Sequence, residues 1–179
     1  MNKIIRNSLS ALALASVANL GHAALVQGTL GATSTGSLDI DVSIQNLVLI
    51  SGLNNISLGT YNGTDPSLTG SDSFCVYRNG SGSYTATVSG SYNAGAGTGF
   101  LVYGGTGSDT MAYTVTYNGT GITHGSTTAT QTGNSSSQSC VGDVGNVNAT
   151  IGVTIQGSVL QAAPTGNYLG TITILISPV

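Results

Sequence analysis

The chain has 179 residues and carries few charges, with three lysines and arginines against six acidic residues. Beyond residue 6, Arg78 is the only basic residue, so the chain from residue 24 onward has one arginine against six aspartates and a formal net charge of −5. This composition excludes nucleic-acid binding, because neutralising phosphates requires several lysines or arginines, and it argues equally against docking on an anionic membrane.

The first residues have the order of a secretory signal peptide. Lys3 and Arg6 form a positive start, an apolar stretch runs from Leu9 to Leu20, and small residues suited to cleavage end at Ala23. The apolar stretch is too short to span a bilayer, and no later segment is apolar enough to do so. We therefore expect residues 1–23 to be removed on secretion, with an uncleaved anchor as the alternative. About 156 residues remain, which is enough for one domain with a short extension.

An alternating segment follows a polar, glycine-rich leader that ends at Gly36. Its apolar and polar side chains separate by parity into Leu38, Ile40, Val42 and Ile44 on one side and Ser37, Asp39, Asp41 and Ser43 on the other. Four regularly spaced aliphatic side chains on an extension fit β-augmentation, in which a strand pairs with the exposed edge of a partner's sheet. The alternative is that residues 37–44 form the first strand of this chain's own sheet.

The rest of the chain has the pattern of short strands separated by turns. Residues 47–50 and 167–176 are apolar on both parities, whereas residues 84–88, 113–117 and 147–155 alternate between apolar and polar. Asn62-Gly63, Asn79-Gly80 and Asn118-Gly119 are turn signals, because both residues of the pair readily adopt positive φ. No helical period occurs after the signal peptide, so we expect almost no helix. These features predict an all-β sandwich or barrel.

Two stretches are too poor in large apolar residues to pack strongly. They run from residue 90 to 107, which is rich in glycine, and from residue 126 to 139, which is rich in serine, threonine and glutamine. We expect surface loops or weakly held edges there, with a short strand at residues 100–103.

The two cysteines, Cys75 and Cys140, follow a signal peptide that directs the chain to an oxidising compartment. We therefore expect one disulfide between them, with two free thiols as the alternative. The closed loop of about 65 residues gives a stabilisation of about 4 kcal/mol in the chain-entropy model.

Catalytic and metal-binding constellations are missing from the sequence. His124 is the one histidine after residue 23 and has no carboxylate near it in sequence, so we expect a loop histidine and no enzymatic activity. Asp39 and Asp41 are the only closely spaced acids, and no calcium loop or zinc ligand set is present. We expect no metal and no cofactor.

Three motifs occur in order along the chain: Ile-Ser-Leu-Gly-Thr-Tyr at residues 56–61, Phe-Cys-Val-Tyr-Arg at 74–78, and Ala-Ala-Pro-Thr-Gly-Asn-Tyr at 162–168, which leads into residues 171–176. With the signal peptide and the alternating segment, they resemble the spore coat protein U family, which includes the archaic chaperone-usher pilins. The resemblance implies an incomplete immunoglobulin-like β-sandwich whose missing strand leaves an apolar groove. A periplasmic chaperone would fill this groove first, and the extension of the next subunit would replace it at an outer-membrane usher.

Applied to this sequence, the resemblance implies an N-terminal extension at residues 24–45 and a sandwich domain at 46–179. The donor side chains would be Leu38, Ile40, Val42 and Ile44, and the groove would be lined by inward residues of the first and last strands, namely Leu47, Leu49, Ile172, Ile174 and Ile176. Many family members have a cysteine early in the first strand of the domain, which this chain lacks. The disulfide would therefore be placed differently from the commoner pattern.

The function that the resemblance implies is that of a structural subunit of a surface pilus or fimbria-like fibre. The subunit would be secreted through the periplasm to the cell surface, would assemble by strand donation between neighbouring subunits, and would support adhesion or biofilm formation. The alternative is a self-contained, secreted β-sandwich that serves as a binding or matrix module.

Overall fold

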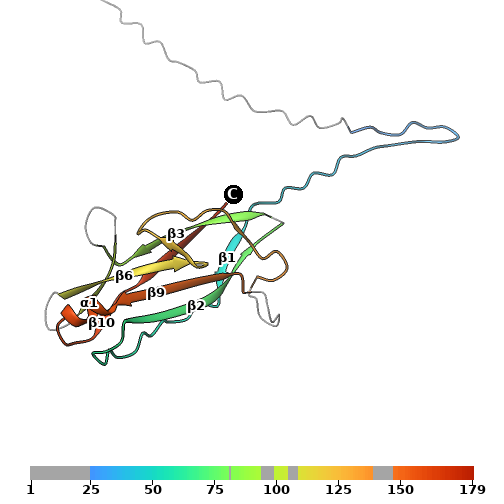
Figure 1. Ribbon diagram of the computed structural model, residues 1–179. Coiled ribbons are helices and arrows are strands. Elements are labelled where there is room, and N and C mark those ends of the chain that lie inside the picture. The colour runs from blue at the N-terminus through green and yellow to red at the C-terminus, as the bar shows by residue number, and fades with distance from the viewer. Residues whose placement is uncertain (1–24, 81, 94–98, 105–108, 139–146) are drawn as a thin grey trace, which may run out of the picture. The chain divides into compact units, whose positions relative to one another are not determined.

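The computed structural model describes residues 25–80, 82–93, 99–104, 109–138 and 147–179 (Figure 1). The predicted signal peptide lies outside the described residues. The chain divides into two units, residues 1–44 and residues 45–179, one residue before the boundary that the sequence predicts. In the described part, no helix is both long and apolar enough to cross a bilayer.

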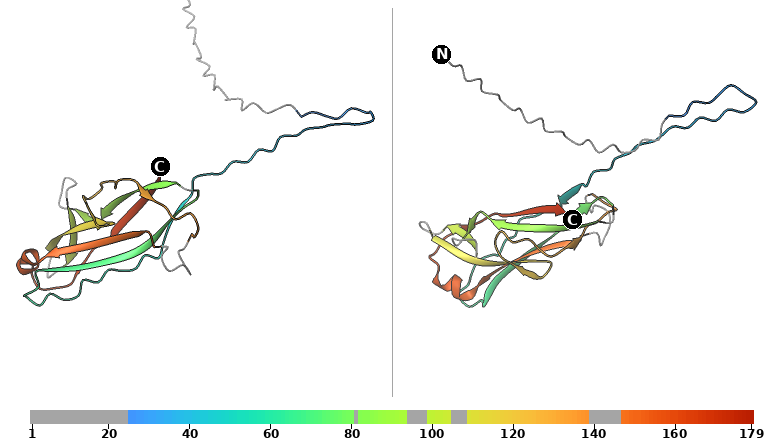
Figure 2. Two further views of the ribbon diagram at one scale, coloured as in Figure 1. Left: turned by 45° about the vertical axis from the view of Figure 1, so that its right-hand side comes forward. Right: turned by 90° about the horizontal axis from the view of Figure 1, so that it is seen from above.

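The unit of residues 45–179 is a sandwich of two antiparallel sheets, which Figure 2 shows face to face. The larger sheet has the order β1 (Val48–Ser51), β2 (Ser67–Arg78), β9 (Ala149–Gln156), β6 (Asp109–Tyr117), β5 (Phe100–Gly104) and β10 (Tyr168–Leu169), with β4 (Tyr92–Asn93) paired to β5 and β7 (Thr120–Ile122) paired to β6. The smaller sheet has the order β11 (Ile172–Pro178), β3 (Ser83–Gly90) and β8 (Gln131–Thr132). The prediction of an all-β sandwich is confirmed.

The core lies between the sheets and follows the predicted alternation. Tyr84, Ala86 and Val88 of β3 are fully buried, as are alternate residues of β6 and β9. Val147 is an exception, because β9 begins only at Ala149 and leaves Val147 exposed ahead of it. Alternation therefore identifies the inner faces of β3, β6 and β9.

A buried hydroxyl pair joins the two sheets. The Tyr84 hydroxyl of β3 lies 3.0 Å from the Tyr117 hydroxyl of β6, and the ring of Tyr117 meets that of Phe74 edge to face. Burial raises the pKa of both tyrosines, and the shared hydrogen bond raises that of Tyr117 further while lowering that of Tyr84. The pair satisfies two hydroxyls that would otherwise be buried without a partner.

The turns and weak segments mostly agree with the sequence. Asn118 and Gly119 have φ of 48° and 78°, which gives the β6–β7 hairpin the positive φ angles of a type I′ turn. The expected weak edge at residues 126–139 contributes β8 and single bridges at Thr127 and Asn134. The expectation of almost no helix needs one correction, since α1 (Gly157–Ala162) forms a short helix directly after β9.

Candidate strand-exchange site

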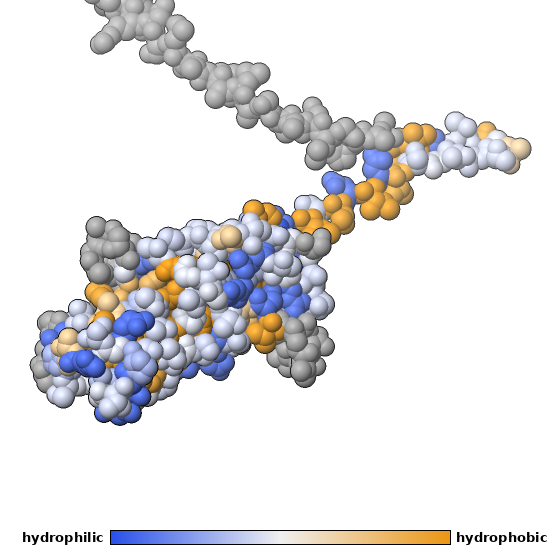
Figure 3. Space-filling model, viewed as in Figure 1, coloured by the Kyte–Doolittle hydropathy of each residue, from blue (hydrophilic) through white to orange (hydrophobic). Residues whose placement is uncertain are grey.

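The alternating segment near the N-terminus presents its apolar side chains to solvent. Leu38, Ile40, Val42 and Ile44 are 69%, 88%, 79% and 82% exposed. Residues 38–47 belong to no strand in the structure. Figure 3 shows apolar residues in orange along this segment.

The start of the segment pairs with the leader that precedes it. Val26 and Ser37 exchange two backbone hydrogen bonds of 3.1 and 3.0 Å, which closes a loop in the leader just ahead of Leu38. Beyond Ser37 the apolar side chains of the segment are exposed, and its residues belong to no strand.

One edge strand of the larger sheet, β1, lies beside one edge strand of the smaller sheet, β11. β1 pairs only with β2 in the larger sheet, and β11 pairs only with β3 in the smaller sheet, over the residues that the structure describes. Val48 and Ile50 of β1 and Ile172 and Ile174 of β11 pack against the core but stay partly exposed, and Ile176 is buried. Both edges therefore combine unpaired backbone with an apolar inner face.

The two edges run in opposite directions from a common end of the sandwich. The Nη2 atom of Arg78 donates to the Asn46 Oδ1 at 3.3 Å and to the Val179 backbone oxygen at 3.2 Å. Asn46 lies just before β1 and Val179 just after β11, so one guanidinium links the start of the first strand to the end of the last. Figure 1 marks the C-terminus near β1. A strand placed between these edges would be antiparallel to one of them and parallel to the other.

The residues predicted to line a groove differ in whether they pack against the core. Ile172, Ile174 and Ile176 face inward, while Leu175 between them is 61% exposed. On β1 the inward residues are Val48 and Ile50, whereas Leu47 and Leu49 face the other way and are 55% and 46% exposed. The inner face of β1 is therefore formed by the alternate residues of the same segment.

Arg78 and Asn79 hold the residues that precede β1, a role that the sequence did not reveal. The Asn79 Oδ1 accepts from the Leu47 backbone N–H at 2.8 Å, and the Asn79 Nδ2 donates to the Gln45 carbonyl at 2.6 Å. The Asn79 backbone N–H donates to the Leu47 carbonyl at 3.2 Å. Arg78 is only 7% exposed and donates its Nη1 to the Asn79 carbonyl at 3.0 Å.

These contacts explain why the only arginine after residue 6 is buried. Added Cβ atoms at Gly82 and Gly133 would meet the Arg78 side chain, so both glycines leave the room that it occupies. In the sequence, a basic residue stands directly before an Asn-Gly pair, but a turn alone is enough to explain that pair. Gly80 does adopt a φ of 70°.

No protein-family model and no curated protein sequence matches the chain. Among solved structures, it is similar to a chain from a chaperone–tip adhesin complex described as vital for the synergistic activation of CFA/I fimbriae biogenesis. The TM-score is 0.48 at 16% sequence identity, and the match covers 75% of this chain. The chain spans 41% of the length of that structure.

Cys75 lies in β2 and is buried, with its Sγ 3.9 Å from the Ser137 carbonyl. Cys140 lies outside the described residues, so the disulfide between Cys75 and Cys140 stays a prediction. The short distance to Ser137 brings the segment that leads to Cys140 up to Cys75.

His124 and Asp72 are engaged in structural contacts. The Nε2 of His124 lies 3.1 Å from the Gly90 carbonyl, and its ring packs against Phe100 with the centroids 5.3 Å apart. Asp72 accepts from the Asn54 backbone N–H at 2.7 Å and fixes the turn after β1. In the part of the chain that the structure describes, no three His, Cys, Asp or Glu side chains are grouped so as to hold a metal ion.

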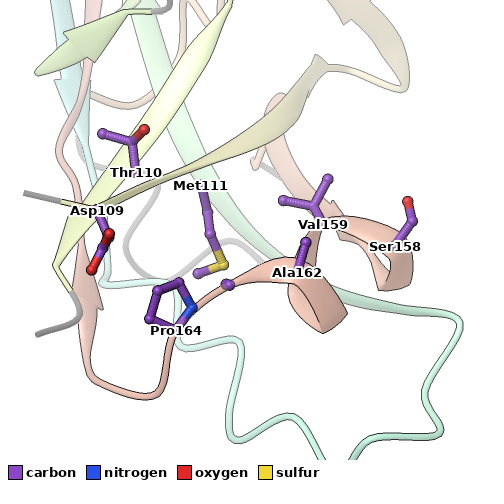
Figure 4. Close-up of a pocket in the computed structure, with 8 residues that line it drawn as sticks. Asp109, Thr110, Met111, Ser158, Val159, Ala162 and Pro164 are labelled. Carbon is purple, nitrogen blue, oxygen red and sulfur yellow. The ribbon is translucent and has the colours of Figure 1, made fainter.

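The pocket in Figure 4 is an open depression of about 560 Å³ between the start of β6 and α1. Asp109 is the one titratable residue among its eight lining residues, which are otherwise small, apolar or hydroxyl-bearing. Among these eight described residues, a single carboxylate forms no acid–base pair and no nucleophile with a base.

Proposed function

We propose that this chain is a secreted structural subunit of a surface fibre, in which residues 37–44 of one copy complete the sandwich of the next. One observation carries the proposal: a segment outside any strand, with four exposed aliphatic side chains, occurs in the same chain as two edge strands with apolar inner faces, each paired on one side only among the described residues. Alternate residues on a strand are about 7 Å apart, so the donor side chains and the row of Ile172, Ile174 and Ile176 have the same spacing.

The energetics favour insertion over exposure. Burying each donor side chain contributes about 1.5–3 kcal/mol, so the four together contribute of order 6–12 kcal/mol before the cost of ordering the segment. Backbone hydrogen bonds to β11 and β1 would satisfy the edge groups that are now unpaired. Because the donor and the acceptor are different surfaces, the contact is head to tail and produces a linear fibre.

The proposed strand donation also implies partners during secretion. A subunit with two unpaired edges and a partly exposed apolar inner face aggregates unless another protein covers the groove during secretion. The resemblance to the spore coat protein U family and its archaic chaperone-usher pilins supplies the candidates, namely a periplasmic chaperone and an outer-membrane usher. In this proposal the chain passes through the periplasm to the cell surface, has no enzymatic activity, and supports adhesion or biofilm formation as part of the fibre.

The experiment is to shear native cells that carry the chain with residues 37–44 deleted and to compare the material with wild type by electrophoresis and negative-stain microscopy. We expect detergent-resistant ladders and thin fibres from wild type and from the outward control Ser43→Ala, and neither from the deletion or from Ile40→Asp. Ladders that persist without residues 37–44 would refute strand donation. A wild-type monomer that refolds alone would support the binding-module alternative.

A further inference from the structure

The contacts of Asn79 point to a further role in the same assembly. We propose that Asn79, supported by Arg78, keeps residues 45–47 extended, so that the donor segment completes the sandwich of a second copy and not its own. This inference rests on the proposed function, since it concerns which groove residues 37–44 enter. Asn79 is a positioning residue, because it contacts neither the donor side chains nor the inner face of the groove.

The favoured direction of the donor is set by the longer edge. β11 offers seven residues and β1 offers four, and antiparallel pairing is slightly more stable per residue than parallel pairing. A donor in the gap should therefore run antiparallel to β11, which makes it parallel to β1.

The chain's own segment cannot enter in that direction. A strand parallel to β1 would have to end at the far end of β1 and then return to its start, which takes a crossover of a dozen or more residues. Residues 37–44 span about 24 Å as a strand, whereas the four steps from Ile44 to Val48 reach at most about 14 Å. The strand in this orientation must therefore come from another molecule, which in the fibre is a second copy.

The opposite direction would require a hairpin in which residues 45–47 form a tight turn in front of β1. Asn79 opposes that turn with its side-chain amide, which donates to the Gln45 carbonyl and accepts from the Leu47 N–H. A parallel neighbouring strand makes the same two bonds around a central residue, here Asn46, and the pattern requires extended backbone. The side chain of Asn79 thus acts as one link of a β-ladder.

Arg78 makes this arrangement possible by occupying the Asn79 carbonyl. In a regular antiparallel ladder the Leu47 N–H would donate to that carbonyl, but the carbonyl accepts from the Arg78 Nη1 and the Asn79 Oδ1 receives the Leu47 N–H instead. The Arg78 Nη2 also donates to Asn46, so each of the three linker residues is bound by Arg78 or Asn79. A turn at residues 45–47 would break all of these bonds at once.

The test uses Asn79→Ala in the full-length chain expressed in its native cells, with Asn62→Ala as a matched control. Asn62 is also followed by glycine, but it hydrogen-bonds its own loop at Thr64 and Asp65. We expect Asn79→Ala to raise the monomer-to-polymer ratio roughly tenfold, the effect of losing one or two hydrogen bonds of ordinary net strength. In that monomer, residues 37–44 should be protected from proteolysis, whereas in wild-type and Asn62→Ala monomer they should be cleaved.

A second variant keeps Asn79 and changes the length of the link. Inserting about twelve Gly/Ser residues between Ile44 and Gln45 provides the crossover that the topology requires. We expect this chain to close on itself as a monomer with residues 37–44 protected, even if Asn79→Ala folds poorly.

The outcomes separate this inference from the proposed function. If wild type forms no polymer and deleting residues 37–44 changes nothing, the proposed function fails, while protection of residues 37–44 in the Asn79→Ala monomer alone would still support the inference. Protection of residues 37–44 in the wild-type monomer would overturn the inference. It would also be overturned if Asn79→Ala polymerised as wild type does and residues 37–44 were cleaved in its monomer.

Discussion

Ile174 and Leu175 are neighbours on β11 that face opposite sides of the edge strand, so they form a matched pair for testing the groove. Ile174 packs partly against the core, and Leu175 is 61% exposed. Truncating Ile174 to alanine removes three carbon groups from the inner face, where a buried methylene is worth about 0.8 kcal/mol. We expect each subunit joint in a fibre to lose about 2 kcal/mol, a roughly 30-fold weaker association.

The assay is the temperature at which detergent-resistant ladders of sheared material collapse to monomer. For a unit of this size, a loss of about 2 kcal/mol corresponds to a decrease of roughly 4–8 °C. Leu175→Ala should leave the temperature within about 1 °C, because an exposed side chain on the outer face gains little from insertion. Equal effects of the two substitutions, or a larger effect of Leu175→Ala, would refute the assignment of the inner face.

Three further predictions concern the stability of the sandwich. Tyr84→Phe and Tyr117→Phe should each cost about 1–3 kcal/mol in denaturant unfolding because one buried hydroxyl loses its partner, whereas the double substitution should cost less than their sum; additive costs would contradict the pairing. Burial raises the pKa of Tyr84, Tyr113 and Tyr117 above the unfolded value of about 10. Below pH 10 the free energy of unfolding should therefore not depend on these groups, and above pH 10 it should fall by up to about 1.4 kcal/mol per pH unit for each. Unfolding curves recorded at alkaline pH would show this decrease. Cys75→Ser should lower the stability by up to about 4 kcal/mol and make it insensitive to reductant, and a wild-type chain already insensitive to reductant would argue against the disulfide.

The strands that the sequence predicts best are those with one buried face. In β3 and β6 the buried residues alternate strictly with more exposed ones, because each strand has the core on one side only, and the pattern is therefore visible in the residues themselves. The first half of β2 lacks this signal. In this half, an added Cβ at Gly70 would meet the side chains of Ile56 and Leu58. Apolar side chains from another segment therefore cover this part of β2.

The sequence does not predict which alternate residues face inward where a segment is apolar on both faces. Residues 47–50 contain only Leu, Val and Ile, so nothing in their order distinguishes Val48 and Ile50 from Leu47 and Leu49. The pairing of Val48 with Arg78 and the packing against the core decide the parity, and both are tertiary facts. The role of Asn79 could not be predicted for a similar reason, because an Asn-Gly pair indicates a turn but not which carbonyl the asparagine side chain reaches.

The central claim is that residues 37–44 of one copy lie beside β11 of another. The most direct measurement places a photo-cross-linking residue at Ile40 in cells that express isotopically heavy and light copies, followed by mass spectrometry of the cross-linked peptides. We expect cross-links that join residues 37–44 to residues 172–178, with heavy and light peptides mixed in the same product. Cross-links to β11 only within one isotopic form, or none to β11 at all, would contradict it.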